Sequence, residues 1–264
     1  MEIGRNSWSF TVLVGVLILF LLAPVLFVFP ISFSNDPFLS FPPRSWGVRY
    51  YIDLPSRSVF VAAFRTSVLL AGVVTVLSLA LAIPAAYAIA RLNLRGRDWL
   101  MGVFTAPLLL PSIVLGLAIL LVFIRLDLIA TYPGLITAHL VITLPYALRI
   151  VATALATIPP SIEDAAATLG APPLVVFWRV TLPQMLPGIF AAAALSFLVS
   201  FDEVVLSLFV VGPQLSTFPV EMFRYVETRT DPLIAAASVI LILFTLGLVL
   251  VLERTVGLAR AVAK

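Results

Sequence analysis

Residues 161–188 read SIEDAAATLGAPPLVVFWRVTLPQMLPG, the longest interruption in a sequence that is otherwise almost entirely apolar. Ser161 can cap the amino end of a helix, and the carboxylates of Glu163 and Asp164 then meet the positive end of the helix dipole. Gly170 is suited to a left-handed cap, and the two prolines that follow it prevent continuation. The stretch therefore predicts a helix of about two turns.

One face of this short helix is apolar and built from small side chains. Ile162, Ala165, Ala166 and Leu169 recur at helical spacing, so the helix is amphipathic. Because a free helix of this length is unstable in water, a neighbour must hold it. Amphipathicity alone does not say whether that neighbour is lipid or protein. Residues 174–180 predict a second, interfacial helix that ends at Leu182-Pro183.

Composition decides the class of protein. The chain has 264 residues, of which 62% are hydrophobic and 11% charged, and its mean hydropathy is +1.16. Several separate apolar runs reach the ~20 residues that a bilayer-spanning helix needs, whereas a barrel would show short alternating segments. We therefore expect an all-α integral membrane protein. The net charge of +3 includes no basic cluster that could follow a phosphate backbone, so we expect no nucleic-acid partner.

We expect residues 1–264 to form a single transmembrane domain with six spans and a cytoplasmic loop at 157–186. The predicted spans are residues 9–31, 64–90, 99–124, 134–156, 187–211 and 232–252. The short turn 91–98 carries three arginines, and the positive-inside rule places it, together with both termini, in the cytoplasm. Arginines 44, 49, 57, 65, 125, 224 and 229 then lie on or near the outer side, so the assignment depends on the short turn.

The spacing within the interruption resembles a known signature. Asp164-Ala165-Ala166 is followed by three residues, Gly170, nine residues, Val180, one residue and Leu182-Pro183. This resembles the EAA signature of the permease subunits of binding-protein-dependent ABC importers. The sequence departs from that signature in having Asp164 for the usual glutamate and Val180 for the usual isoleucine, and both changes are chemically mild.

The resemblance implies a type I ABC importer permease whose helix near residue 164 is a cytoplasmic coupling helix. The partners that it implies are a cytoplasmic ABC ATPase dimer, a solute-binding protein in the periplasm or outside the cell, and a second permease chain, for which a heterodimer is favoured over a homodimer. It also implies a multi-pass protein of the bacterial inner membrane. The residues expected to couple to the ATPase are Glu163, Asp164, Ala165, Ala166, Gly170, Leu182 and Pro183.

The sequence contains no GxxxxGK[ST] phosphate-binding loop. We therefore expect this chain not to be an enzyme, with ATP and Mg²⁺ bound by the separate ATPase subunit. We expect no catalytic, cofactor-binding or metal-ligating residue. His139 is the one histidine, and a lone histidine within a span is most often a packed, hydrogen-bonded residue. An intramembrane enzyme would need clustered nucleophiles, bases or metal ligands, so this class is poorly supported.

An acidic pair, Asp202-Glu203, lies towards the outer end of the fifth predicted span. Ionisable residues in an apolar span normally face a cavity or a partner. We predict that one carboxylate lines the translocation route and that the other bonds within the bundle, because adjacent helical residues point about 100° apart. The alternatives are a structural pairing with Arg224 or Arg229, or simple exposure at the outer mouth.

The run Ser200-Phe201-Asp202-Glu203, followed by Gly212-Pro213, resembles the importer branch that handles polyamines, opines, phosphonates and ferric iron. A polyamine such as spermidine or putrescine fits the acidic pair best, because a carboxylate stabilises a cation in a low-dielectric path. A phosphonate would instead favour the arginines. A different class, an ion-coupled secondary transporter, predicts ionisable residues at the midplane and broken helices in matching halves, and the sequence shows neither clearly.

Overall fold

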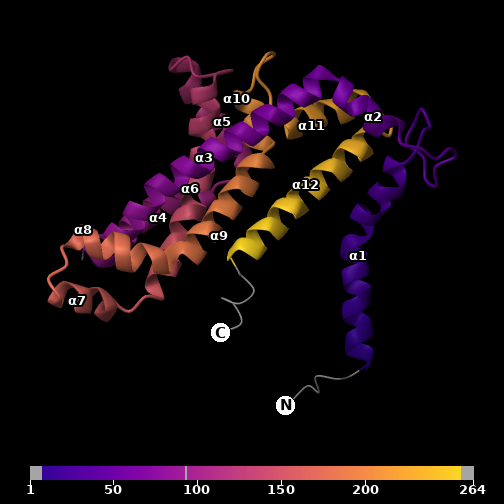
Figure 1. The fold of residues 1–264 in the computed structure, drawn as a ribbon. Coiled ribbons are helices and arrows are strands. Elements are labelled where there is room, and N and C mark those ends of the chain that lie inside the picture. Colours follow the sequence, from indigo (N-terminus) through magenta and orange to yellow (C-terminus); the bar gives the residue numbers. More distant parts are fainter. Residues whose placement is uncertain (1–7, 93, 257–264) are drawn as a thin grey trace. The chain divides into compact units, whose positions relative to one another are not determined.

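The computed structural model describes residues 8–92 and 94–256, and within these the regular structure is helical apart from an isolated bridge between Ser34 and Trp46. The described residues form two compact units: one comprises residues 8–61 and 224–244, and the other residues 62–92, 94–223 and 245–256. The helices, labelled in Figure 1, are α1 (Trp8–Ser32), α2 (Arg49–Ser56), α3 (Ser58–Arg91), α4 (Arg97–Thr105), η1 (Ala106–Leu109), α5 (Ser112–Arg125), α6 (Tyr132–Ala156), α7 (Pro160–Thr168), α8 (Pro173–Val176), η2 (Phe177–Thr181), α9 (Leu182–Phe201), α10 (Val205–Val210), α11 (Phe218–Thr228) and α12 (Leu233–Val256).

The apolar spans confirm an all-α membrane fold. Within the described residues, five helical stretches are long and apolar enough to cross a membrane, and a bent pair makes a sixth if its two halves form one span. The five are Phe10–Ser32, Ser58–Arg91, Tyr132–Ala156, Pro173–Phe201 and Leu233–Val251. The bent pair joins Arg97–Leu109 to Ser112–Arg125.

The third predicted span, 99–124, is therefore not one straight helix. Its two halves meet at an angle of 102°. Leu110 is extended, as a residue before a proline tends to be, and Pro111 precedes the first turn of α5. Pro107 lies in the 3₁₀ turn η1 just before the bend. Prolines in bilayer helices often cause only a kink, but here they separate two helices.

The fifth predicted span, 187–211, differs from the structure at both ends. The helical run begins at Pro173 and ends at Phe201, and α10 follows as a separate short helix. The expected break at Leu182-Pro183 does not occur, because Phe177–Thr181 form a π-helical turn in which the Leu182 N–H bonds to the Phe177 carbonyl. This wider turn lies directly before Pro183, which lacks an N–H and would crowd a regular α-turn. The loop predicted at 157–186 thus contains α7 and the first turns of this run.

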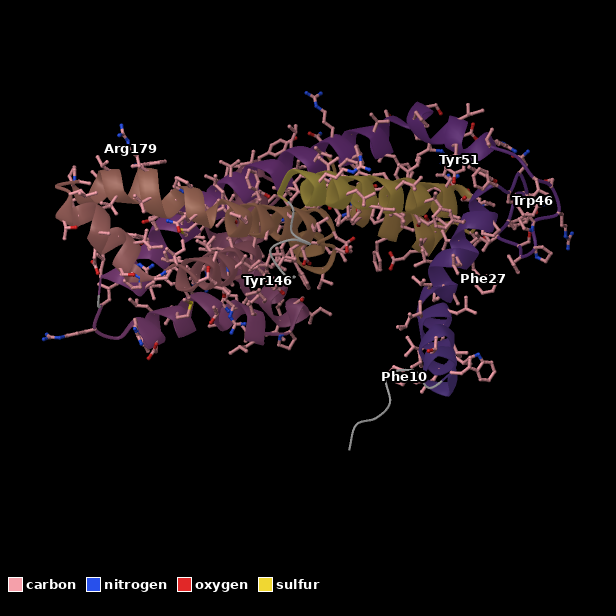
Figure 2. All side chains as sticks on the ribbon, turned by 60° about the horizontal axis from the view of Figure 1, so that its bottom comes forward. Phe10, Phe27, Trp46, Tyr51, Tyr146 and Arg179 are labelled. Carbon is pink, nitrogen blue, oxygen red and sulfur yellow. The ribbon has the colours of Figure 1, made fainter. Side chains whose placement is uncertain are left out.

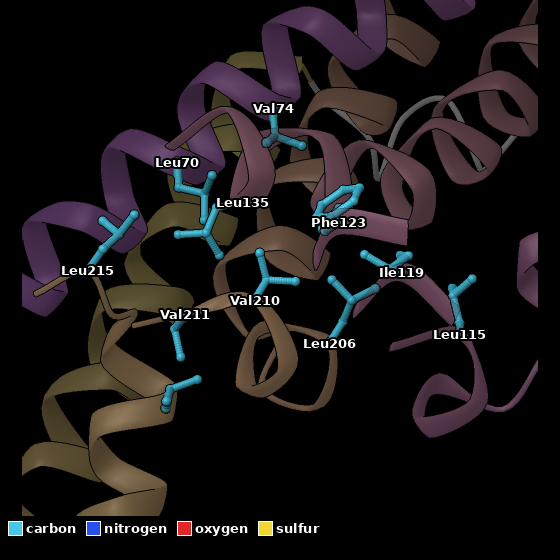
Figure 3. Packing of buried hydrophobic residues seen from close by; sticks show 12 residues of the cluster. Leu70, Val74, Leu115, Ile119, Phe123, Leu135, Leu206, Val210, Val211 and Leu215 are labelled. Carbon is cyan, nitrogen blue, oxygen red and sulfur yellow. The ribbon is translucent and has the colours of Figure 1, made fainter. Parts of the chain in front are cut away.

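The larger unit has a core of aliphatic side chains from α3, α5, α6 and α10. Leu70, Val74, Ile119, Leu135 and Leu206 are among its buried members, several of which are labelled in Figure 3. A second buried cluster is rich in alanine, which lets membrane helices approach closely. α6 and α9 are especially close, since a Cβ atom at Gly188 would overlap the Cβ atom of Ala154.

In the smaller unit, the loop between α1 and α2 is organised around Asp36. Its carboxylate accepts hydrogen bonds from the Ser40 hydroxyl (2.9 Å), the Arg44 N–H (2.8 Å) and the Ser45 hydroxyl (2.7 Å). These donors, the Ser45 hydroxyl first, hold the pKa of Asp36 well below its usual range. The apolar side chains of α1, including Phe10 and Phe27 in Figure 2, are exposed, as suits a lipid-facing helix.

Candidate functional site

Helix α7 is the short helix that the sequence predicts, but it begins two residues before the start that a cap at Ser161 implies. Its first residue is Pro160, and no side chain caps it, so the predicted Ser161 cap is wrong. A proline at the first helical position has a φ angle already set for the helix, and its missing N–H would have had no partner there. Glu163 occupies the first turn, as predicted, whereas Asp164, predicted for the same turn, lies just beyond it.

The carboxyl end of α7 is closed by Gly170, which has a φ of +85°. The Gly170 N–H bonds to the Ala167 carbonyl (2.9 Å) and the Ala171 N–H to the Ala166 carbonyl (3.2 Å). These two bonds form a Schellman motif and satisfy carbonyls that the helix end leaves free. The predicted left-handed cap is confirmed. A Cβ atom at Gly170 would find open space.

The surface of α7 is exposed and largely apolar. No residue of the helix is buried, and Leu169, which follows it, is 89% exposed. The next turns add Leu174 and Trp178, both exposed. Figure 1 shows α7 as a separate short helix joined to α6 and α8 by connecting segments. A two-turn helix with so little internal support is expected to be completed by another surface.

The adjacent acidic residues of α7 point in different directions. Asp164 is exposed, whereas the Glu163 side chain is 12% exposed and forms an ion pair with Arg91, the last residue of α3 (3.1 Å). The Thr181 hydroxyl also donates to Glu163 (2.9 Å). Arg91 and Thr181 were missed as site residues by sequence reasoning, because the partners lie 72 and 18 residues from Glu163 along the chain. The signal that the sequence did offer was the position of Arg91 at the start of the short basic turn 91–98.

The other predicted coupling residues lie in two places. Asp164, Ala165, Ala166 and Gly170 lie on or directly after α7. Leu182 and Pro183 are instead the first residues of α9, after the π-helical turn. Their connection to α7 runs through Thr181, the residue before them, which bonds to Glu163.

The acidic pair lies at a break between helices rather than within a continuous span. Helix α9 ends at Phe201, Asp202 follows it, and α10 begins at Val205. A Glu203 carboxylate oxygen accepts a hydrogen bond from the Leu206 N–H (2.8 Å), so Glu203 satisfies a free donor at the start of α10. Asp202 is exposed, next to the negative end of the α9 dipole.

His139 is fully buried on α6 and bridges the two sides of this break. Its Nδ1 lies 2.9 Å from the hydroxyl of Ser200, in the last turn of α9, and its Nε2 lies 2.9 Å from the hydroxyl of Ser207 on α10. The Ser207 hydroxyl donates to the Glu203 carbonyl (2.8 Å). The proton of the Ser207 hydroxyl is therefore used, so in a neutral ring Nε2 donates to Ser207 and Nδ1 accepts from the Ser200 hydroxyl. Both ring nitrogens are engaged, as expected for a packed, hydrogen-bonded histidine.

Taken together, these features define a class. The chain is a multi-pass helical membrane protein that presents one exposed, capped helix between spans and carries a carboxylate at a break between helices. Its fold matches that of a chain in the crystal structure of a bacterial ABC transporter involved in the import of the acidic polysaccharide alginate. The match has a TM-score of 0.73 at 17% identity and covers 95% of this chain and 99% of that chain.

Residues 78–258 match the family described as binding-protein-dependent transport system inner membrane component, and the chain belongs to this family of type I ABC importer permeases. It is 31% identical over 256 residues to the putrescine transport system permease protein PotI of Escherichia coli (strain K12), covering 94% of this chain and 90% of that protein. It is 34% identical over 222 residues to the molybdenum transport system permease protein ModB of Mycobacterium tuberculosis, covering 78% of this chain and 81% of that protein.

Proposed function

We propose that this permease carries a small polycationic solute of the polyamine class inward and is driven by a separate ATPase dimer that docks on α7. The proposed docking rests on the exposed, apolar surface of α7, a helix whose carboxyl end is capped by Gly170 in a left-handed conformation. Because the chain has no phosphate-binding loop, ATP and Mg²⁺ are bound by the ATPase subunits and this chain performs no hydrolysis.

Asp202 is the residue proposed to meet the solute. It is exposed at a helix end where backbone carbonyls already give a negative potential, and it adds a full negative charge. A cationic amine would be stabilised there, whereas an oxyanion such as molybdate or a phosphonate would be repelled. The similarity to the putrescine permease agrees with this sign of charge, and the similarity to the molybdenum permease makes an oxyanion the alternative to test.

The remaining parts of the proposal concern assembly. One chain supplies half of the route, so a second permease completes it, and we favour a related but different chain. A solute-binding protein delivers the solute from outside. Both termini and α7 lie in the cytoplasm, since the ATPase must reach α7, and the short basic turn 91–98 agrees with this orientation.

The test is a substitution series at Gly170, measured in proteoliposomes that contain the permease pair, the ATPase and the binding protein. Gly170→Leu adds a bulky side chain whose Cβ atom has open space in this chain, so the added bulk is directed at a docked partner. We expect membrane insertion to be retained while putrescine uptake per ATP hydrolysed falls at least about tenfold, through misdocking worth more than ~1.4 kcal/mol.

Two controls separate docking from backbone strain. Gly170→Ala introduces the same unfavourable φ without the bulk, and we expect it to cost about 1 kcal/mol of local stability with most uptake kept. Gly96→Leu places the same bulk at a second glycine of positive φ (+81°), one that lies outside α7 and also has open space at its Cβ position. Normal uptake by Gly170→Leu, or transport that follows an ion gradient without any ATPase, would contradict the proposed function.

A further inference from the structure

Arg91 connects three segments that are far apart in the sequence. Its Nε donates to both carboxylate oxygens of Glu163 in α7 (3.1 and 3.3 Å). Its Nη2 donates to the carbonyl of Ile158 (2.8 Å) and, at 3.4 Å, to that of Leu155 in the last turn of α6. The guanidinium group therefore joins the end of α3, the end of α6 and the first turn of α7.

The ion pair is enclosed by protein. The Arg91 side chain is 14% exposed and that of Glu163 is 12% exposed, in contrast to the surface pair Arg97–Asp98, whose side chains are 62% and 96% exposed. Surface pairs contribute little, whereas a buried pair that loses one partner leaves an uncompensated charge. Thr181 supplies a further donor to Glu163, so the carboxylate is held from α3 and from η2.

Few other contacts hold α7 to the rest of the chain. None of its residues is buried, and Glu163 and Ala166 are its half-buried members. The helix also lies against α8 and η2, where the Thr181 hydroxyl donates to Glu163, and it is joined covalently to the chain at each end. A force applied to α7 from outside therefore reaches the spans through these contacts and connections and, towards α3 and α6, through the Arg91–Glu163 ion pair.

We propose that Arg91 and Glu163 are positioning residues that transmit displacement of α7 to α3 and α6, so that movement of the docked ATPase is converted into movement of the spans. The inference depends on the proposed function, because it takes α7 to be the docking helix. Glu163 then acts on the permease side of the coupling helix, and the neighbouring exposed Asp164 is left to face the ATPase.

The experiment is a double-substitution cycle in the reconstituted complex. Glu163→Gln and Arg91→Gln each remove one charge while nearly keeping the shape, and each leaves the other charge enclosed and unpaired. We expect each to lower uptake per ATP hydrolysed by about tenfold or more while ATP turnover persists, and we expect the double variant to be no worse than either single one. Thr181→Val should have a smaller effect.

A conservative variant at Arg91 and a control substitution at the surface test whether the loss of uptake has a purely structural cause. Arg91→Lys keeps the charge but loses the planar fork, so we expect it to restore part of the uptake lost in Arg91→Gln. Arg97→Gln removes a surface charge of the same turn and should leave uptake unchanged. Copurification of the ATPase and the amount of protein in the membrane are measured for every variant.

The outcomes separate the two proposals. Unchanged uptake per ATP in both glutamine variants, or losses that merely follow lower protein amount or lost ATPase binding, would overturn the transmission role while leaving the proposed function in place. A wild-type complex whose ATPase neither copurifies nor drives uptake would overturn both proposals.

Discussion

At the scale of single residues, the chain has two pairs of neighbouring carboxylates, and the two side chains of each pair point in different directions and have different partners. In each pair one member bonds within the protein: Glu163 to Arg91 and Glu203 to the Leu206 N–H. The other member, Asp164 or Asp202, is exposed. The sequence predicted this division at Asp202-Glu203 from the divergence of adjacent helical residues, although the pair lies at a break between helices, and it did not say which residue is which.

The exposure of Asp202 and the hydrogen bond of Glu203 within the protein lead to a prediction about transport. Asp202→Asn removes the exposed negative charge, and we expect the KM for putrescine uptake to rise about tenfold, since a charge-assisted contact contributes ~1.5–3 kcal/mol. Glu203→Gln keeps an oxygen that can accept the Leu206 N–H bond, so we expect uptake to change less than about threefold. Both are measured in proteoliposomes with a saturated binding protein.

A molybdate uptake assay on the same variants provides the control for charge. If the route accepts an oxyanion, Asp202→Asn should increase that uptake, and the polyamine proposal would then be wrong. Equal kinetics for putrescine in wild type and both variants would leave the acidic pair with a structural role only.

At the scale of elements, proline and glycine signals predicted some of the points at which helices change, but not the form of each change. The bend at Leu110-Pro111 falls inside a stretch that the sequence predicted as one span, and the π-helical turn lies next to Leu182-Pro183, where the sequence predicted a helix end. One proline ends a helix and the other is absorbed into a continuous run, because neighbouring backbone and packing decide whether the freed carbonyls find new partners. Gly170 was predictable, since a left-handed helix end has a strong local preference.

The hydrogen-bond cluster of His139, Ser200 and Ser207 connects the helices on the two sides of the break after α9. His139→Leu would leave two buried hydroxyl groups without a ring partner, and we expect it to lower the free energy of unfolding by about 1–3 kcal/mol. We also expect faster amide hydrogen exchange at residues 202–206, because the ring connects the two sides of the break. Exchange measured by mass spectrometry in detergent gives the local effect.

Thr137→Val is the matched control, since Thr137 is exposed on the same helix and should leave the exchange of residues 202–206 unchanged. If His139→Leu raised exchange evenly along α6, α9 and α10, the histidine would be an ordinary core residue and not a bridge across the break.

At the scale of the whole molecule, the sequence predicted the class well because composition and the length of apolar runs are global signals. It failed to predict the Arg91–Glu163 ion pair and the His139 contacts, whose partners lie 61 to 72 residues apart. No local periodicity encodes such pairings, and they depend on how α3, α6 and α9 pack. The sequence therefore predicts where the functional residues lie along the chain, but it does not predict the side-chain contacts between them.

The orientation of the chain can be tested directly, because the native sequence contains no cysteine and single cysteines can be labelled without background. Trp46→Cys lies in the loop after α1, Leu169→Cys directly after α7 and Phe20→Cys within α1, and all three positions are exposed. With a charged, membrane-impermeant maleimide, we expect Trp46→Cys to react in intact spheroplasts and Leu169→Cys only after permeabilisation. Phe20→Cys should react in neither, since an apolar span excludes water and the charged reagent.

Leu169→Cys also reports on docking, because a bound ATPase should cover it. We expect its labelling rate in permeabilised membranes to fall when the partner ATPase is present, whereas Trp46→Cys should be unaffected. Labelling of Leu169→Cys from outside intact spheroplasts would place α7 beyond reach of any cytoplasmic ATPase, and the proposed coupling through α7 and Arg91 would then be wrong.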